Sequence, residues 1–358
     1  MFFAWLLLAL MVAGLILEWR LRAHCTRHIA DIFENVPPFN VVAAKQSSGS
    51  RSLEFRTADG LRLCGSLFLP GQQEPLGLVI FFHEIRGNHA MAPRYCQALL
   101  SEGFALLGFD FRNEGGSESA SDYEPIHWIT EYEMTDVAGV LEFIESDPQL
   151  STLPLLAFGV SRGGVAALLA GCRYPRIRAV IADSAFGTMP MALHFVDRFV
   201  RHVIPRWLYS TLPDWHVRLS LRQGLELSEQ RRGCRYTHLE SEVSGLRDTP
   251  VLLISGRRDT YVTPKVARQL WQVVGPSAEL WVVDGAKHNL ARMVATEEYD
   301  RRIVQHFRTA LAGDLPSAGI RVATEGAPAN AESTGSFPPA DCSQSEPHVT
   351  TPEALVTA

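Results

Sequence analysis

Apolar and polar residues alternate along the chain in blocks that indicate a mostly parallel sheet covered by helices. Short apolar runs ended by polar or turn residues are typical of buried strands, and the stretches between them have helical spacing. Because these blocks alternate between residues 51 and 312, we expect one α/β domain there. The expected strands are residues 53–56, 61–69, 78–82, 105–109, 153–158, 179–182, 251–254 and 280–283, and two of the expected helices are residues 131–144 and 264–274. The first two strands are expected to form a hairpin around the tight-turn pair Asp59-Gly60.

The chain begins with an apolar run that charge does not interrupt until Glu18. Its length is near the short end of the roughly 17 to 25 residues that cross a bilayer. We interpret residues 1–22 as a membrane anchor and residues 23–50 as a linker. A cleaved signal peptide would need basic residues before the run and a small-residue site after it, and a lipoprotein signal would need a small residue in place of His24 before Cys25. A buried core helix is the remaining alternative, but an all-round apolar terminal helix has no polar face to expose.

The charges that follow the apolar run predict how the chain is oriented. Arg20, Arg22 and Arg27 come after it, while only the amino terminus precedes it. The positive-inside rule therefore predicts a single-pass membrane protein whose catalytic domain lies in the cytoplasm. The six cysteines are scattered, with no C-x-x-C pair and no Cys/His cluster at zinc spacing, which favours free thiols in a reducing compartment. We expect no metal and no cofactor.

Two further segments differ from the alternating core. Residues 183–249 lack strand character, and we expect an inserted helical cap at about residues 187–246. We interpret its aromatic side chains as packing residues, with a lipid-binding face as the alternative and some lining the substrate pocket; they are Phe195, Phe199, Trp207, Tyr209 and Trp215. Residues 313–358 hold a single aromatic, Phe337, so we predict a disordered tail.

Overall charge argues against one class of partner. The chain has 20% charged residues and a net charge of -6, which is ordinary for a globular protein and unlike a nucleic-acid binder. We expect no nucleic-acid partner. Oligomeric state is not indicated by the sequence.

The strongest motif is the G-x-S-x-G sequence from Gly159 to Gly163. It follows an apolar strand and opens an alanine-rich helical run, the strand–turn–helix context of a nucleophile elbow. The flanking glycines leave room where a Cβ would strike a neighbouring strand or helix. The alternative is that Ser161 only caps an ordinary helix. We favour Ser161 as a catalytic nucleophile.

A serine nucleophile needs a histidine base and a carboxylate, expected downstream in the order Ser, Asp, His. Asp259 follows the strand at 251–254, and His288 follows the strand at 280–283. We predict these two residues as the acid and the base. A surface Asp259 paired with Arg257 or Arg258 is the alternative, and Asp183 and Asp284 are reserve candidates for the acid.

Acyl transfer also needs two backbone N–H donors for the oxyanion. We assign one to Arg162, which follows the nucleophile, and the other to Ile85, in the loop after the strand at 78–82. His83 is expected to order that loop by hydrogen bonding. Glu84 must point away from the oxyanion or be neutralised, and the candidate partners are Arg86, Arg112 and Arg162.

The motifs HEIRGN, FDFRNEGGS, GVSRGG, SGRRDTYVTP and DGAKH occur in the order of the α/β-hydrolase superfamily, which the chain resembles over roughly residues 51–312. Within it, the chain resembles the membrane-anchored BEM46-like serine hydrolases, with an oxyanion loop similar to that of dienelactone hydrolase. Most relatives have His-Gly where this chain has His83-Glu84, and Ser161 stands where dienelactone hydrolase has cysteine. The resemblance implies an eight-stranded, mostly parallel sheet with helices on both faces.

These observations predict an esterase- or lipase-like serine hydrolase that cleaves a carboxylic ester through an acyl-enzyme. Its substrate is expected to be a small acyl compound, with thioesters, acylglycerols and peptides left open. The alternative is a membrane-tethered binding protein that kept the fold and lost the chemistry. Fold alone does not decide between them.

Overall fold

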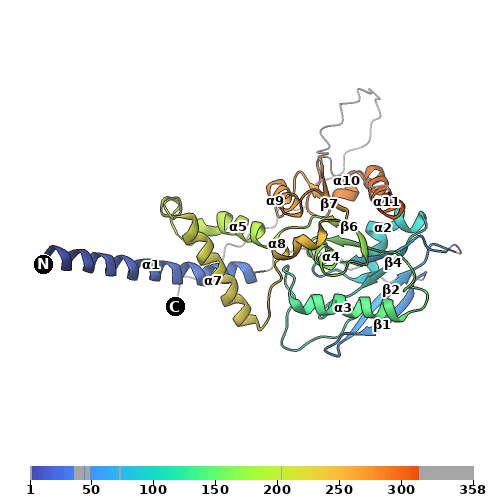
Figure 1. The fold of residues 1–358 in the computed structure, drawn as a ribbon, viewed down its shortest axis with the longest axis horizontal. Coiled ribbons are helices and arrows are strands. Elements are labelled where there is room, and N and C mark those ends of the chain that lie inside the picture. The colour runs from blue at the N-terminus through green and yellow to red at the C-terminus, as the bar shows by residue number, and fades with distance from the viewer. Residues whose placement is uncertain (1, 36–43, 45–48, 72–73, 203, 314–358) are drawn as a thin grey trace, which may run out of the picture. The chain divides into compact units, whose positions relative to one another are not determined.

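The computed structural model describes residues 2–35, 44, 49–71, 74–202 and 204–313, and these build one large sheet with helices on both faces (Figure 1). Eight strands in the described part of the chain pair in the order β1-β2-β4-β3-β5-β6-β7-β8. The pairs β1–β2 and β2–β4 are antiparallel, and every later pair is parallel. The strands are β1 (Arg51–Arg56), β2 (Arg62–Phe68), β3 (Leu78–Phe82), β4 (Ala105–Phe109), β5 (Leu155–Val160), β6 (Ile177–Asp183), β7 (Val251–Gly256) and β8 (Ala278–Val283). This is the α/β-hydrolase fold that the sequence predicts.

The apolar runs become strands because both faces of the central sheet are covered. In β3, Leu78, Ile80 and Phe82 face one hydrophobic cluster, while Val79 and Phe81 face the other. The first cluster includes side chains from α3 (Glu131–Ser146), α4 (Arg162–Arg173) and α9 (Pro264–Val274). The second includes side chains from α2 (Ala92–Ser101) and α11 (Thr296–Ala312). A strand buried on both faces reads as a continuous apolar run rather than an alternating one.

The strand ends explain where the sequence prediction was off by a few residues. β3 and β4 have the expected bounds, but β5 begins at Leu155 and continues through Gly159 to Val160. β6 and β7 likewise continue into Asp183 and Gly256. These residues stay paired in the parallel ladder although they are not part of an apolar run. Hydrogen-bond pairing, which sequence hydrophobicity does not report, therefore sets the carboxyl ends of these strands.

The first helix, α1 (Phe2–Glu34), is longer than the expected anchor of residues 1–22. Residues 23–34 are helical, so the expected linker at 23–50 is wrong for this part. The cause is a buried stripe at intervals of four residues, formed by Cys25, Ile29 and Phe33, which packs this half of the helix against α7 (Asp214–Arg232). Gly224 makes the contact possible, because a Cβ there would lie 2.4 Å from Cγ2 of Ile29.

The two halves of α1 have different surroundings. Phe33 is 2% exposed, and its ring stacks on Trp128 with the centroids 4.0 Å apart. Trp128 Nε1 also donates a hydrogen bond of 2.9 Å to the Phe33 carbonyl. The amino-terminal half is instead exposed and apolar, and α1 is long and apolar enough to cross a membrane. A signal sequence in this position would have the same length and composition.

The described chain between β6 and β7 contains helices joined by short loops and has no named strand, although Tyr236 forms an isolated bridge with Thr130. Its elements are α5 (Thr188–Phe199), η2 (Val200–His202), α6 (Arg206–Tyr209), α7, α8 (Leu239–Glu242) and η3 (Val243–Leu246). The assignment of this segment as a cap stays a prediction. Its aromatic residues divide into two groups: Phe195 is buried, whereas Trp207 and Trp215 are exposed. The predicted tail at 313–358 lies outside the described residues except for Gly313, where α11 ends.

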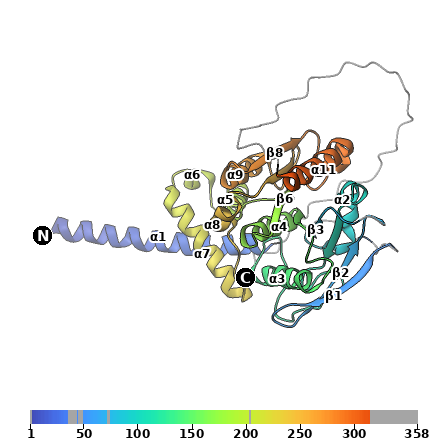
Figure 2. The same cartoon turned by 45° about the vertical axis from the view of Figure 1, so that its right-hand side comes forward.

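The remaining described helices are short. η1 (His89–Met91) directly precedes α2, and α10 (Ala291–Val294) directly precedes α11. Figure 2 shows α11 and α2 close to each other, as expected from their shared hydrophobic cluster.

Phe33→Ala is expected to lower the free energy of unfolding by about 3 to 5 kcal/mol, because it removes a buried ring and leaves a cavity against Trp128. The measurement is denaturant unfolding of the full chain in detergent. The control is Leu17→Ala on the same helix, since Leu17 is 69% exposed. Equal unfolding midpoints for Phe33→Ala and Leu17→Ala would contradict the packing of α1 on the domain.

Candidate active site

Ser161 lies in a tight turn between β5 and α4. Its backbone has φ 54° and ψ −120°, a conformation that is strained for a residue with a side chain. The turn is possible because its neighbours are glycines: a Cβ on Gly159 would lie 2.1 Å from the Gly163 carbonyl oxygen, and a Cβ on Gly163 would lie 2.1 Å from that of Phe82. This backbone packing brings the first turn of α4 against the ends of β3 and β5.

The structure brings the three predicted catalytic side chains together in one hydrogen-bonded chain. Ser161 Oγ lies 3.0 Å from Nε2 of His288, and Nδ1 of His288 lies 2.7 Å from Oδ2 of Asp259. A carboxylate only accepts hydrogen bonds, so in this arrangement Nδ1 carries the proton and Nε2 can accept from the serine hydroxyl. This is the geometry in which an imidazole can take the serine proton.

Asp259 is held in place by its own loop. Its Oδ1 accepts hydrogen bonds of 2.8 Å from the backbone N–H groups of both Tyr261 and Val262, which leaves Oδ2 for His288. Arg257, the alternative partner considered from sequence, forms an ion pair with Asp284 instead. Asp284 is therefore paired at the surface and away from His288.

Asp183, the other reserve candidate for the acid, is hydrogen-bonded to the turn at Ser161. Its backbone carbonyl accepts a 2.7 Å hydrogen bond from the Ser161 N–H. Its carboxylate accepts hydrogen bonds of 2.9 Å from Tyr299 Oη and from Ser184 Oγ. Burial raises the pKa of the Asp183 carboxyl to about 6. Ser184 Oγ also accepts a 3.2 Å hydrogen bond from the N–H of Asn289, next to the histidine.

The loop after β3 is ordered by His83. Its Nδ1 lies 2.7 Å from the Glu84 carbonyl oxygen, and its Nε2 accepts a 3.2 Å hydrogen bond from the Phe111 N–H. The backbone then turns sharply at Arg86, where φ is 62°. Ile85 lies at the start of this turn, and its side chain is buried. Arg162 begins α4, where the first N–H groups have no partner within the helix.

Glu84 does not pair with any of the three arginines proposed from sequence. Its carboxyl group is buried, and Oε1 accepts a 3.0 Å hydrogen bond from Tyr95 Oη on α2. Oε2 has no hydrogen-bond partner among the described residues. The arginine hypothesis fails because Arg112 and Arg162 are already bound by other carboxylates. Burial and the adjacent Glu84 raise the pKa of the Tyr95 phenol well above its usual range.

Glu114 joins the two halves of the predicted oxyanion hole. Its Oε1 accepts a 2.6 Å hydrogen bond from the backbone N–H of Arg86, and its Oε2 pairs with the Arg162 guanidinium. Arg162 is fully buried, and its Nη1 also donates a 3.1 Å hydrogen bond to the Ile126 carbonyl. A second carboxylate, Glu133, lies 3.7 Å from the same nitrogen. One buried carboxylate thus fixes both the loop after β3 and the start of α4.

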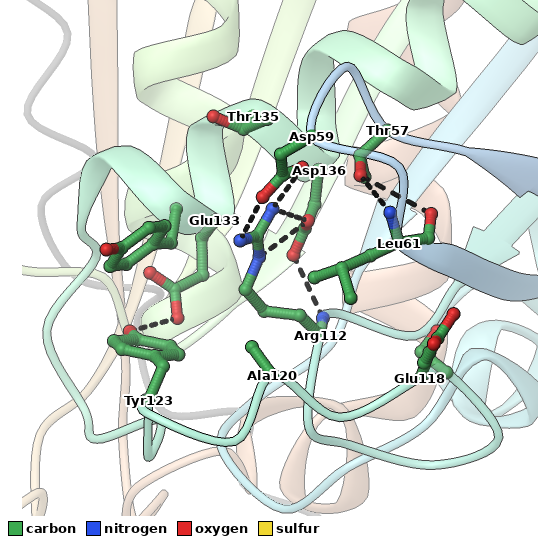
Figure 3. A network of polar contacts seen from close by, with 12 residues as sticks. Thr57, Asp59, Leu61, Arg112, Glu118, Ala120, Tyr123, Glu133, Thr135 and Asp136 are labelled. Atoms are coloured by element: carbon green, nitrogen blue, oxygen red, sulfur yellow. Dashed lines mark hydrogen bonds and ion pairs between the residues drawn. The ribbon is translucent and has the colours of Figure 1, made fainter.

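A second buried arginine anchors the loop that carries Glu114. Figure 3 shows Arg112 between the carboxylates of Asp59 and Asp136. The Arg112 backbone N–H donates a 2.9 Å hydrogen bond to Asp136, which ties this loop to α3. In the same view, Tyr123 donates a 2.5 Å hydrogen bond to Glu133. Two ion-pair networks therefore hold the loop from 110 to 118 beside the nucleophile turn.

A cluster of aromatic side chains lies next to His288. The Tyr261 ring lies 5.0 Å from the His288 ring, and Phe195 of α5 lies 5.6 Å from Tyr261. His127 is next to them, with its ring 6.1 Å from Tyr261 and 5.8 Å from Phe195. Burial lowers the pKa of His127 to about 3, so its imidazole is neutral at pH 7. Neither of its ring nitrogens has a hydrogen-bond partner among the described residues.

Sequence reasoning missed Glu114, Glu133, Tyr95 and His127. Each acts through residues far away in the chain, so no local spacing connects them. One signal was available for Glu133: Thr130 and Glu133 form a capping box at the start of α3, which a T-x-x-E pattern indicates. Among the described residues, no group of three or more His, Cys, Asp and Glu side chains could hold a metal ion.

Comparisons with known proteins agree with this fold. Residues 73–238 match the family model of the serine aminopeptidases, S33. A thiohydrolase, aneE, from Aspergillus aculeatus is 29% identical over 130 residues, which are 36% of this chain and 40% of that protein. The match thus spans less than half of that relative's length.

Solved structures share the fold. The esterase Pf2001 from Pyrococcus furiosus has a TM-score of 0.56 and 23% identity, covering 76% of this chain and 97% of that one. The α/β hydrolase GrgF from Penicillium sp. sh18 has a TM-score of 0.52 and 18% identity, covering 74% and 99%. Together these matches support a serine hydrolase of the α/β-hydrolase superfamily. The narrower resemblance to BEM46-like hydrolases stays a prediction.

Glu114→Ala is expected to lower the free energy of unfolding by about 3 to 5 kcal/mol, because it removes a main partner of the buried Arg162 guanidinium. Glu145→Ala is the matched control, since it also removes a carboxylate from an arginine, but Glu145 and Arg176 are exposed. The control is expected to cost about 0 to 1 kcal/mol. Denaturant unfolding of both variants makes the comparison, and equal losses would contradict the proposed role of the buried pair.

Proposed function

We propose that this protein is a serine hydrolase that cleaves a carboxylic ester through an acyl-enzyme intermediate. The observation that carries the proposal is the chain of hydrogen-bond distances from Ser161 through His288 to Asp259. The strained turn at Ser161 adds support, because such a turn exposes the hydroxyl at the end of a strand. The superfamily assignment supports the same chemistry.

In the proposed first step, Oγ of Ser161 attacks the ester carbonyl carbon while His288 Nε2 takes the hydroxyl proton. Asp259 stabilises the resulting imidazolium without taking its proton. The negative oxygen of the tetrahedral intermediate is stabilised by the backbone N–H groups of Ile85 and Arg162. The intermediate collapses, and the leaving alcohol receives the proton from His288. Water then attacks the acyl-enzyme by the same route and releases the acid.

Glu114 is assigned a positioning part in this scheme. It touches neither the triad nor the two backbone N–H groups assigned to the oxyanion, but it binds the backbone next to Ile85 and the side chain of Arg162. Both N–H groups must be aimed at one oxygen, and errors of about an ångström in such sites are costly. The buried ion pair fixes the relative position of the two backbone segments that carry them.

A thioester is the second candidate substrate class. The observation that favours it is the similarity to a protein named as a thiohydrolase, over 130 residues. The proposed steps are the same, except that a thiolate leaves instead of an alkoxide and needs less help from a general acid. A panel of oxygen esters and thioesters with matched acyl chains distinguishes the two, because the preferred class has the higher kcat/KM.

The exposed apolar half of α1 supports a membrane-anchored protein. We propose that α1 spans the bilayer once and that the hydrolase domain lies in the cytoplasm. The arginines that follow the apolar run support this orientation.

Ser161→Ala is expected to abolish labelling by a fluorophosphonate probe and to lower ester turnover by roughly 10⁶-fold, because the nucleophile is lost while the fold stays intact. Labelling is measured by fluorescence in a gel, and turnover with short- and long-chain acyl esters. Ser146→Ala, at an exposed serine on α3, is the control and should label like the wild type. Labelling of Ser161→Ala would identify another nucleophile, and an unlabelled but folded wild type would favour the binding-protein alternative.

External protease is expected to leave the hydrolase domain intact in whole cells and to digest it after permeabilisation. The reason is the proposed cytoplasmic orientation. The measurement is an immunoblot of the full chain before and after treatment, with a known cytoplasmic protein as control. Digestion in whole cells, with the control protein intact, would reverse the orientation.

A further inference from the structure

The structure relates the end of the apolar run of α1 to a definite part of the predicted cap. Glu18 is the first charged residue after that run. Its Oε1 lies 3.3 Å from Nδ1 of His216, near the start of α7. The contact is partly buried, since His216 is 3% exposed. The start of α7 therefore lies at the level where α1 would leave a bilayer.

The length of the apolar run also indicates where along α1 the membrane surface would lie. Its 17 residues span about 25 Å of helix at about 1.5 Å per residue. The hydrocarbon core of a bilayer is about 30 Å thick. A helix that crosses this core would therefore reach the headgroup region just beyond Leu17, close to Trp19, which is 60% exposed.

Three large aromatic side chains of the predicted cap are exposed, and we call them the aromatic tip. Trp207 is 69% exposed, Trp215 is 58% exposed and Phe199 is 37% exposed. Trp215 directly precedes His216, and Trp207 lies on α6, which packs against η2 after Phe199. Figure 2 shows α6 at the upper end of α7, which crosses α1 lower down. Tryptophan is enriched at membrane interfaces, where its ring lies among the headgroups.

Charge and packing in the same region fit a lipid surface. Residues 197–222 contain five arginines and two aspartates, whereas the whole chain has a net charge of -6. Cytoplasmic leaflets are anionic and attract such basic segments. The predicted cap and α1 also share an apolar pocket whose lining includes Ile29, Ile32, Val196, Val200, Leu212 and Val217. The apolar contact keeps the aromatic tip beside the helix that would enter the bilayer.

We propose that the aromatic tip is embedded in the headgroup region of the bilayer that α1 spans, on the cytoplasmic side. Membrane docking at two places, α1 and the tip, fixes the domain against the membrane surface. Phe195 of α5 lies close to both the apolar pocket and the candidate active site. Its neighbour Val196 lines the pocket, and its own ring contacts Tyr261, which lies beside His288. The proposed hydrolase is thereby directed to acyl compounds held in that leaflet. The inference rests on the proposed anchoring by α1 and not on the catalytic chemistry.

The test is tryptophan quenching in proteoliposomes of full-length protein, with phosphatidylcholine that carries bromine at acyl carbons 6 and 7, near the headgroups. Double substitution Trp207→Phe and Trp215→Phe is expected to remove about two of the quenched tryptophans. Trp271→Phe is the control, since Trp271 packs on the sheet side and donates a hydrogen bond to Ala278. Replacing Trp271 should reduce only the fluorescence that the brominated lipid does not quench.

Trp5→Phe reports on the anchor independently, because Trp5 lies within the apolar run. Loss of quenched emission in both Trp5→Phe and the double variant supports the proposal. Loss in Trp5→Phe alone overturns docking of the tip while α1 still spans the membrane. No loss in either variant overturns both. None of these results depends on ester turnover, so failure of the proposed chemistry is measured separately by the fluorophosphonate probe.

Discussion

The close backbone packing around Ser161 is the constraint on which the rest of the site depends. A serine backbone with positive φ is strained, so the surrounding structure must hold it in this conformation. The close backbone contacts of Gly159 and Gly163 do this. Any side chain at either glycine would push α4 away from the sheet. The same contacts place α4 against the end of β3, and so beside the loop that carries Ile85. The proposed nucleophile and the proposed oxyanion donors are therefore positioned by one packing arrangement.

Buried ion pairs of Arg112 and Arg162 then fix the position of the loop from 110 to 118 relative to the Ser161 turn. Arg162 and Arg112 are both almost fully buried, and each is bound by two carboxylates. Such pairs add little net stability compared with apolar packing, but they cost much when one partner is lost. They specify relative position, since a guanidinium fits its carboxylates in few geometries. The loop from 110 to 118 is held by these ion pairs together with the fully buried ring of Phe111, which packs on Phe109.

The sequence was sufficient where one local pattern determined the structure. β3 and β4 have the bounds that their apolar runs predict, because both strands are buried on both faces. α9 begins at Pro264, as predicted from the preference of proline for the first position of a helix. Ser161, Asp259 and His288 were predicted from their positions after strands, since the carboxyl ends of parallel strands meet at one edge of a sheet. The structure brings their side chains within hydrogen-bond distance.

The sequence was insufficient where distant residues share one contact. Glu84 was expected to meet an arginine, but Tyr95 lies closer and both nearby buried arginines are bound elsewhere. Likewise, the helix of α1 continues to Glu34 because α7, far later in the sequence, supplies a surface for Ile29, while Phe33 packs on Trp128 and Tyr236. Neither partner can be inferred from the local sequence around Glu84 or Arg22.

The extension of α1 changes what an anchor does in this protein. A flexible linker after residue 22 would let the domain sample many orientations at the membrane. A continuous helix that packs on α7 and stacks Phe33 on Trp128 instead transmits the direction of α1 to the domain. Trp128 also contacts Phe186 and Phe195, which lie beside Tyr261 near the base. The helix that would cross the membrane therefore packs, through Phe33 and Trp128, against the same aromatic side chains that lie beside His288.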